Sequence, residues 1–184
     1  MSSVEKLNRA LGAGDWKTAD EILSRLARKA PADAALLYNL GRVKMERGQW
    51  PAARTWLRRA LAAAPSHAHA WFELGRTELK LGDLAAAQQG FARAMALDPS
   101  DADARLNLAR IATRLADHAA VREALAPLAG QTAEIDALRY RAAAELGLPE
   151  AEPEAAALWS RKGARAEALK ALTRVAKGRL SLDL

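Results

Sequence analysis

The chain has 184 residues, of which 51% are hydrophobic and only 5% aromatic, and it carries a net charge of +6. Alanine dominates the hydrophobic fraction, and because alanine, leucine, arginine and glutamate favour helices while strand-forming residues are scarce, the composition predicts an all-α protein. The absence of cysteine excludes disulfides and thiolate metal sites.

The two ends of the chain differ in charge. The first six residues are polar or charged, unlike a secretory signal, and no stretch approaches the roughly 20 apolar residues of a membrane-spanning helix. We therefore expect a cytoplasmic protein without a membrane segment, and the richness in alanine and arginine is typical of a bacterial source. Residues 161–184 hold seven basic and two acidic side chains, a net charge of +5, so the basic character is local and does not predict a nucleic-acid partner.

Four sets of residues recur every 34 positions through the first hundred residues. They are Gly14, Gly48 and Gly82; Pro31, Pro65 and Pro99; Ala19, Ala53 and Ala87; and Leu23, Leu57 and Phe91. Glycine closes a helix cheaply in the left-handed conformation, and proline stops the next helix. The period therefore predicts helix–turn–helix units of about residues 1–33, 34–67, 68–101 and 102–131.

Polar residues beside these turns predict where helices begin. Asp15 and Asp83 are expected to cap the second helices of their units. Asp33, Ser66 and Ser100 are expected to start the first helices that follow.

The third unit resembles the tetratricopeptide repeat (TPR) closely. Its matching residues are Trp71, Leu74 and Gly75 in the W-x₂-L-G opening, Ala87 and Phe91 in A-x₃-F, and the closing Pro99. The second unit matches with Leu37, Leu40 and Gly41, while Lys44 and Glu78 stand where the family often has tyrosine, a departure expected to affect packing only. The resemblance implies a right-handed α-solenoid of antiparallel helix pairs.

The resemblance fades at both ends. The first unit has Leu7 at the glycine position, and the fourth lacks the closing proline and has Pro127 inside its second helix. We therefore divide the chain into a TPR array, 1–131, and a degenerate repeat with a C-terminal capping helix, 132–184. That last helix, about 164–178, carries Lys170, Arg174 and Lys177 on its polar face.

No catalytic or metal-binding pattern is present. His67 and His69 are two residues apart, so they do not share a helical face, and His118 occupies a packing position. Glu150, Glu152 and Glu154 indicate a solvated turn, and Trp16, Trp50 and Trp71 occupy repeat-core positions. We expect no enzyme activity, no metal and no cofactor.

The resemblance implies that first helices line a groove that holds an extended peptide. The groove positions carry Asn8, Arg42, Arg76 and Arg110; Glu5, Asn39, Glu73 and Asn107; and Val4, Tyr38, Phe72 and Leu106. Arginine forks suit carboxylates, so we predict an acidic peptide as partner. Alternatively, the arginines pair with Glu46, Glu73 and Asp103 and keep the groove soluble.

Several functions remain open. The leading hypothesis is a scaffold or adaptor that binds a protein segment. The chain could instead be the substrate-recognition arm of a larger transferase or hydroxylase, or a self-associating oligomer. A chaperone-tail clamp is not expected, because Asn8 and Asn39 match its asparagines but Val4, His69 and Glu73 occupy its cationic positions.

Overall fold

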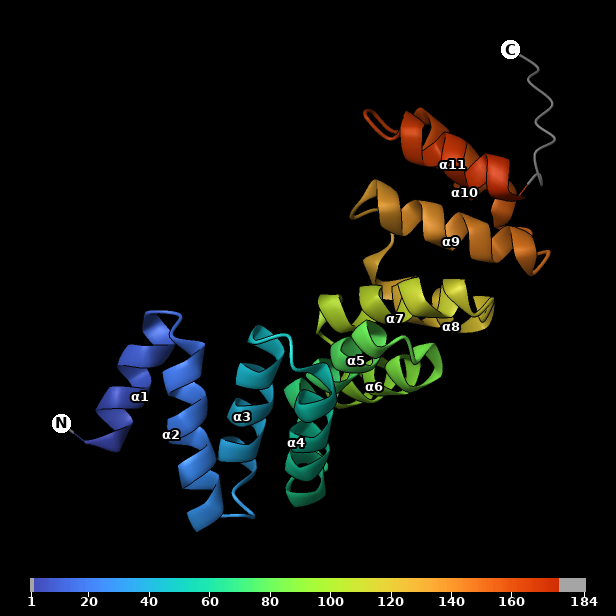
Figure 1. Cartoon of the computed structure of the whole chain (residues 1–184). Helices are drawn as coiled ribbons and strands as arrows, with labels where there is room; N and C mark the ends of the chain where they lie inside the picture. Colours follow the sequence, from blue (N-terminus) through green and yellow to red (C-terminus); the bar gives the residue numbers. More distant parts are fainter. Residues whose placement is uncertain (1, 176–184) are drawn as a thin grey trace. The chain divides into compact units, whose positions relative to one another are not determined.

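The computed structural model describes residues 2–175, in which the chain forms helices and no strand (Figure 1). Its internal contacts group it into two compact units, Met1–Pro99 and Ser100–Leu184. The N-terminal unit contains α1 (Ser3–Gly12), α2 (Trp16–Lys29), α3 (Ala34–Glu46), α4 (Trp50–Ala63), α5 (Ala68–Leu81) and α6 (Leu84–Leu97). The predicted all-α solenoid of helix pairs is confirmed.

The C-terminal unit continues the pairing of helices. It contains α7 (Ala102–Arg114), α8 (His118–Leu125), a 3-10 turn η1 (Ala126–Leu128), α9 (Ala133–Glu145), α10 (Ala151–Ser160) and α11 (Arg165–Val175). Pro127 lies in the 3-10 turn, because proline cannot donate the hydrogen bond that would extend α8. The predicted last helix ran to 178, and its part beyond Val175, with Lys177, lies outside the described residues. The predicted boundary between 131 and 132 stays a prediction.

Left-handed residues separate the two helices of each pair, as the glycine period predicts. Gly14 and Gly48 have φ of 68°, and Gly82 has φ of 84°. In the fourth pair the same position holds Ala116, which adopts φ of 57°. A Cβ atom is unfavourable in this conformation, so the fold strains Ala116 to keep the turn.

Two of the predicted helix starts are wrong by one residue. Asp33 caps α3 as expected, accepting a hydrogen bond from the Leu36 amide at 3.0 Å. At α5 the cap is His67 rather than Ser66, and its Nδ1 accepts from the Ala70 amide at 3.3 Å. At α7 the cap is Asp101 rather than Ser100. In each case the longer acceptor one residue later reaches the free amides of the first turn.

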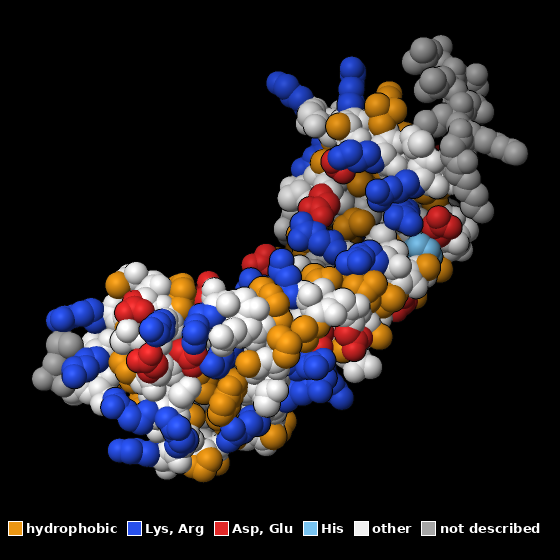
Figure 2. All heavy atoms as spheres, viewed as in Figure 1, with side chains coloured by type: hydrophobic (Ala, Val, Ile, Leu, Met, Phe, Trp, Pro, Cys, Tyr) orange, Lys and Arg blue, Asp and Glu red, His pale blue; other side chains and the backbone are white. Residues whose placement is uncertain are grey.

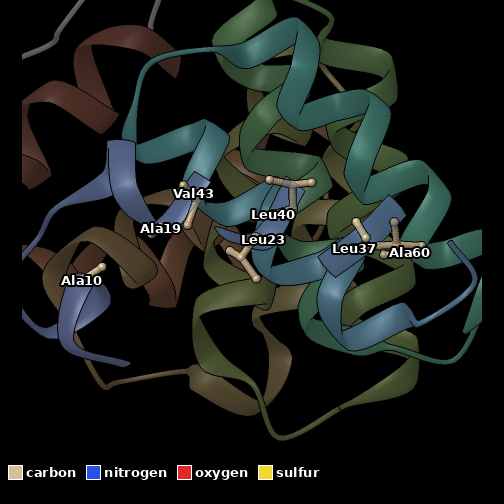
Figure 3. Close-up of a cluster of buried hydrophobic side chains, with 8 residues drawn as sticks. Ala10, Ala19, Leu23, Leu37, Leu40, Val43 and Ala60 are labelled. Atoms are coloured by element: carbon tan, nitrogen blue, oxygen red, sulfur yellow. The ribbon is translucent and has the colours of Figure 1, made fainter. Parts of the chain in front are cut away.

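Leucine and alanine side chains form the core of the N-terminal unit. A central cluster combines Leu23 of α2 with Leu37, Leu40 and Val43 of α3, and small alanines fill the remaining space (Figure 3). Small residues let the backbones of α5 and α6 approach closely, and a Cβ built on Gly90 would lie 2.8 Å from the Gly75 Cα. This packing fixes which faces of the first helices stay exposed.

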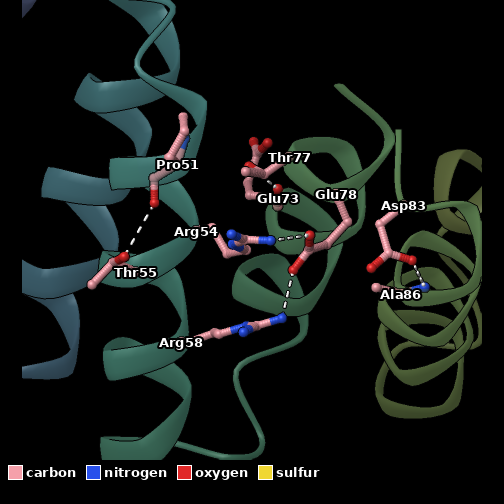
Figure 4. A network of polar contacts seen from close by, with 9 residues as sticks. All are labelled: Pro51, Arg54, Thr55, Arg58, Glu73, Thr77, Glu78, Asp83 and Ala86. Carbon is pink, nitrogen blue, oxygen red and sulfur yellow. Dashed lines mark hydrogen bonds and ion pairs between the residues drawn. The ribbon is translucent and has the colours of Figure 1, made fainter. Parts of the chain in front are cut away.

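Two buried ion pairs each join one repeat to the next, and the positions of the acid and the base are exchanged between the two pairs. Asp20 on α2 accepts from Lys44 on α3 at 2.7 Å, and it also contacts Arg47. The equivalent positions 34 residues later hold Arg54 on α4 and Glu78 on α5, which lie 3.5 Å apart (Figure 4). Lys44 and Glu78 therefore do more than alter packing, contrary to expectation, because each completes an ion pair across a repeat interface.

Candidate functional site

The first helices α3 and α5 bring two arginines to one buried carboxylate. Glu73 of α5 accepts a hydrogen bond at Oε2 from Arg76 Nη1 at 2.9 Å, while its Oε1 lies 3.8 Å from Nε of Arg42 on α3. The Thr77 hydroxyl donates to the Glu73 carbonyl at 2.8 Å, so this buried hydroxyl has a partner within α5. We call Arg42, Glu73 and Arg76 the arginine cluster.

The arginine cluster combines a hidden acid with accessible cations. The Glu73 side chain is only 10% exposed, whereas those of Arg42 and Arg76 are 52% and 50% exposed. The cluster has a net charge of +1, and each contact to Glu73 uses one nitrogen of a guanidinium. The other N–H groups can therefore donate to a ligand, and Glu73 restrains both side chains before a ligand arrives.

Aromatic rings border the arginine cluster. The Tyr38 ring lies 4.7 Å from that of His67, which is in turn 6.3 Å from that of His69. Burial raises the pKa of the Tyr38 phenol above its usual value, and the Arg42 guanidinium partly offsets this effect. Phe72 contacts Phe91 edge-on at 5.5 Å, so part of its ring is committed to the interior. Tyr38 thus offers a neutral hydroxyl beside two cations.

The predicted asparagines of the N-terminal unit are both exposed. Asn39 lines a hollow of about 230 Å³ together with Arg42, Glu46, Leu11 and Trp16. Asn8 lies on α1, also at the surface. An amide beside an accessible guanidinium can both donate to and accept from a peptide backbone.

The predicted site residues of the C-terminal unit are engaged internally. Arg110 of α7 donates through Nε and Nη2 to the two oxygens of Glu134 on α9, both at 2.7 Å. This bidentate pair lowers the pKa of Glu134 and raises that of Arg110. Asn107 donates to the Asp103 carbonyl at 2.8 Å, and Leu106 is half-buried.

The alternative pairing scheme holds only for Glu73. Glu73 binds Arg42 and Arg76 as that scheme required, but Arg110 pairs with Glu134 rather than with Asp103. Figure 2 shows Lys and Arg side chains over the visible surface of each unit, with Asp and Glu among them. Internal pairing therefore accounts for part of the basic surface and leaves the outer donors of Arg42 and Arg76 in reach of solvent.

Sequence reasoning missed Arg141. It is the ninth residue of α9, as Arg42, Arg76 and Arg110 are the ninth residues of α3, α5 and α7. The interval from Arg110 to Arg141 is 31 rather than 34 residues, so a strict period passes over it. Counting from each helix start would have found it.

The acidic segment before Trp159 is not simply a solvated turn. α10 begins at Ala151, and its Glu154 accepts from Arg122 of α8 at 2.6 Å and from Arg139 of α9 at 2.8 Å. Within residues 2–175 no group of three or more histidines and acids could hold a metal ion. In the same range none of the helices has the length and hydrophobicity needed to cross a membrane.

The family comparisons match the repeat pattern. Residues 54–161, more than half of the chain, match the model of the cytochrome c-type biogenesis protein H TPR domain, and residues 10–74 match a tetratricopeptide repeat model. A comparison with curated protein sequences finds no significant match.

Solved structures show the same fold at low sequence identity. A crystal structure of MamA is 20% identical with a TM-score of 0.66, over 94% of this chain and 93% of that one. The second TPR domain of human RPAP3, in complex with an HSP70 peptide, is 24% identical with a TM-score of 0.56, over 60% and 92%. A Thermobaculum terrenum O-GlcNAc transferase mutant is 23% identical with a TM-score of 0.56, over 66% of this chain and 25% of the transferase.

The 34-residue period, the left-handed turns, the stacked helix pairs and a family model that spans more than half of the residues agree with one another. The chain belongs to the tetratricopeptide repeat family.

Proposed function

We propose that this chain is a protein-interaction module, not an enzyme, and that it binds an extended acidic segment of a partner protein on the first-helix surface of the N-terminal unit. The observation that carries this proposal is the arginine cluster, in which two half-exposed guanidiniums are held by one buried carboxylate.

Glu73 prepares the two arginines for a ligand. A flexible arginine loses side-chain entropy when it binds, but Arg42 and Arg76 are already restrained by their contacts to Glu73, so less entropy remains to be lost. Glu73 neutralises only one of the two positive charges. A ligand carboxylate can therefore bind the outward N–H groups, and each exposed contact contributes about 0.5–1 kcal/mol.

The neighbouring polar groups suit a peptide backbone. The Asn39 amide is exposed beside Arg42, and the Tyr38 phenol is protonated at neutral pH, as phenols ordinarily are, with burial raising its pKa further. These groups can bind main-chain carbonyls and amides on either side of an acidic residue. The combination favours an extended acidic peptide over an isolated small anion.

Two similar structures are consistent with this class of ligand. The first TPR domain of Spaghetti (RPAP3) is bound to the HSP90 peptide SRMEEVD, and the second TPR domain of human RPAP3 holds the HSP70 peptide SGPTIEEVD. Both peptides contain neighbouring acidic residues. The similarity at 22% and 24% identity is one of fold, so the acidic ligand of this chain rests on its own arginine cluster.

A peptide-library selection on the immobilised full chain tests the proposal. Selected peptides should be enriched in Asp and Glu, and Arg42→Gln/Arg76→Gln should weaken their binding about 5- to 30-fold in a fluorescence anisotropy titration. The matched control is Arg28→Gln/Lys29→Gln, which removes the same charge from exposed positions of α2 and should leave binding unchanged. Selection of peptides without acidic residues, or equal loss in both variants, would refute the proposal.

A second candidate function rests on the family match over residues 54–161. A relation to the TPR domain of a cytochrome c-type biogenesis protein makes such biogenesis a candidate process for this module. Deletion of the gene should then lower the amount of covalently haem-stained cytochrome c, and complementation should restore it. An unchanged cytochrome content would exclude this role.

A further inference from the structure

A charged hollow lies between α9 and α11 of the C-terminal unit. It has a volume of about 250 Å³, and its lining includes Glu134, Leu138 and Arg141 of α9 with Glu167, Lys170 and Arg174 of α11. α9 is the first helix of its pair, so the hollow lies on the helix that continues the arginine positions of α3, α5 and α7.

Both carboxylates of the hollow already have partners. Glu134 takes the bidentate pair from Arg110, and Glu167 accepts from Lys170 at 2.8 Å. Among the described residues, neither Arg141 nor Arg174 makes a hydrogen bond or ion pair with another side chain. Within the described part of the chain, the guanidiniums of Arg141 and Arg174 therefore line the hollow without an ion pair of their own.

Arg141 shows this deficit most directly. Its Nε is buried and has no hydrogen-bond partner within the described part of the chain. A buried N–H of a charged group is normally paired, and an unpaired one is unfavourable unless something supplies an acceptor. An acceptor in the hollow would bind the Arg141 guanidinium and offset this deficit.

The geometry points to a carboxylate-binding subsite at Arg141 and Arg174, which takes one acidic group of a partner protein. The subsite rests on the proposed function for its class of partner, an acidic segment of a protein. It lies in the C-terminal unit, and a ligand can bind there without binding the arginine cluster. The carboxylate can come from an Asp or Glu side chain or from a chain terminus, because both present the same two oxygens to a guanidinium.

The lining favours a localised carboxylate over a nucleic-acid strand. The hollow has no aromatic side chain on which a base could stack. Glu134 and Glu167 flank the two arginines and would repel a continuous row of phosphates. A single carboxylate meets less of this repulsion than a continuous row of phosphates does.

Titration of the full chain by NMR tests the inference, because arginine Nε–H signals report each site separately. The probe is acetyl-pentaglutamate amide, with inorganic phosphate and a short single-stranded RNA as comparisons. We expect saturable shifts of the Arg141 and Arg174 signals, and about two- to fivefold weaker binding at this site in Arg141→Gln. Arg174→Gln, at an exposed position, gives the same test if Arg141→Gln fails to fold. Lys162→Gln, an equal charge change outside the hollow, should have no effect.

The outcomes separate this inference from the proposed function. Shifts at Arg42 and Arg76 without shifts at Arg141 and Arg174 would overturn the subsite and leave the proposed function standing, whereas the reverse pattern would support the subsite alone. Equal response to phosphate, or tighter binding of RNA, would overturn the assignment to a protein carboxylate. Pentaalanine with a free carboxyl terminus distinguishes the sources: binding equal to pentaglutamate assigns a chain terminus, and weaker binding assigns a side chain.

Discussion

The buried Glu78 allows a test of what the ion pairs contribute to stability. Its side chain is only 1% exposed, and it contacts Arg54 at 3.5 Å and Arg58 at 2.8 Å, whose side chains are 38% and 58% exposed (Figure 4). The acid is thus inside the protein while its partners reach water. Removing the acid and removing the bases should therefore change the free energy of unfolding by very different amounts.

The expected magnitudes follow from this asymmetry. In Arg54→Met/Arg58→Met the Glu78 carboxylate stays buried without a counter-charge. The free energy of unfolding should fall by about 3 kcal/mol, at the lower end of what breaking a buried ion pair costs, because water reaches the arginine side of the pair. In Glu78→Met an apolar side chain of similar length fills the site, and the two arginines can turn into water. That variant should lie within about 1 kcal/mol of the wild type.

Urea unfolding at neutral pH, followed by tryptophan fluorescence, measures these differences. Four of the five tryptophans, Trp16, Trp50, Trp56 and Trp71, lie in the N-terminal unit, so the signal reports on the unit that contains the ion pair. A triple variant, Glu78→Met/Arg54→Met/Arg58→Met, should recover most of the stability that Arg54→Met/Arg58→Met loses.

Two results would refute this reasoning. If Glu78→Met costs as much as the double arginine variant, the ion pair stabilises the fold by more than its desolvation costs. If the triple variant stays as unstable as the double variant, the arginine stems contribute through packing, and the buried charge is not the cause.

Three further predictions concern local structure. Ala116→Gly should stabilise the chain by about 1 kcal/mol in urea unfolding, because the left-handed turn strains alanine, and no gain would mean that the strain is relaxed elsewhere. Gly90→Ala should lower the melting temperature measured by circular dichroism markedly, since its Cβ would lie 2.8 Å from the Gly75 backbone, and a wild-type melting curve would contradict that packing. The pKa of Glu134 is lower in the folded chain than in the unfolded one. Its pair with Arg110 therefore stabilises the fold fully at pH values above the unfolded-state pKa, and this contribution is lost as the pH falls through the folded-state pKa. Arg110→Gln should therefore destabilise at neutral pH and have little effect in acid, as unfolding at both pH values will show.

The helix pairs were predictable because their signals are local. A glycine such as Gly48 marks a left-handed turn by its own lack of a side chain, and Pro127 interrupts a helix by its own missing N–H. The helix starts at His67 and Asp101 were harder to predict, because Ser100 is as good a cap as Asp101 in isolation and Ser66 is a better one than His67. The longer side chains of His67 and Asp101 reach the first-turn amides, and residue type alone does not predict that reach.

The candidate site was predictable in its positions but not in its electrostatics. The repeat placed Arg42, Glu73 and Arg76 on first helices, yet the contact between Glu73 and Arg42 depends on how α3 and α5 pack, which the repeat pattern does not specify. Arg141 was not found because α8 and its 3-10 turn together are three residues shorter than α6, which shifts the period by three residues. In contrast, the reversed ion pairs could have been predicted from the sequence, because Asp20 and Lys44 are separated by the same number of residues as Arg54 and Glu78.

The reversed polarity of those ion pairs restricts how this gene can change its number of repeats. If residues 34–67 were duplicated in tandem, Arg54 of one copy would meet Lys44 of the next, and two cations would share a site that now holds a cation and an anion. If the same residues were deleted, Asp20 would meet Glu78, and two carboxylates would be buried together. Both duplication and deletion of this unit by unequal recombination therefore place two like charges at a repeat interface, which favours the present copy number of the central repeat.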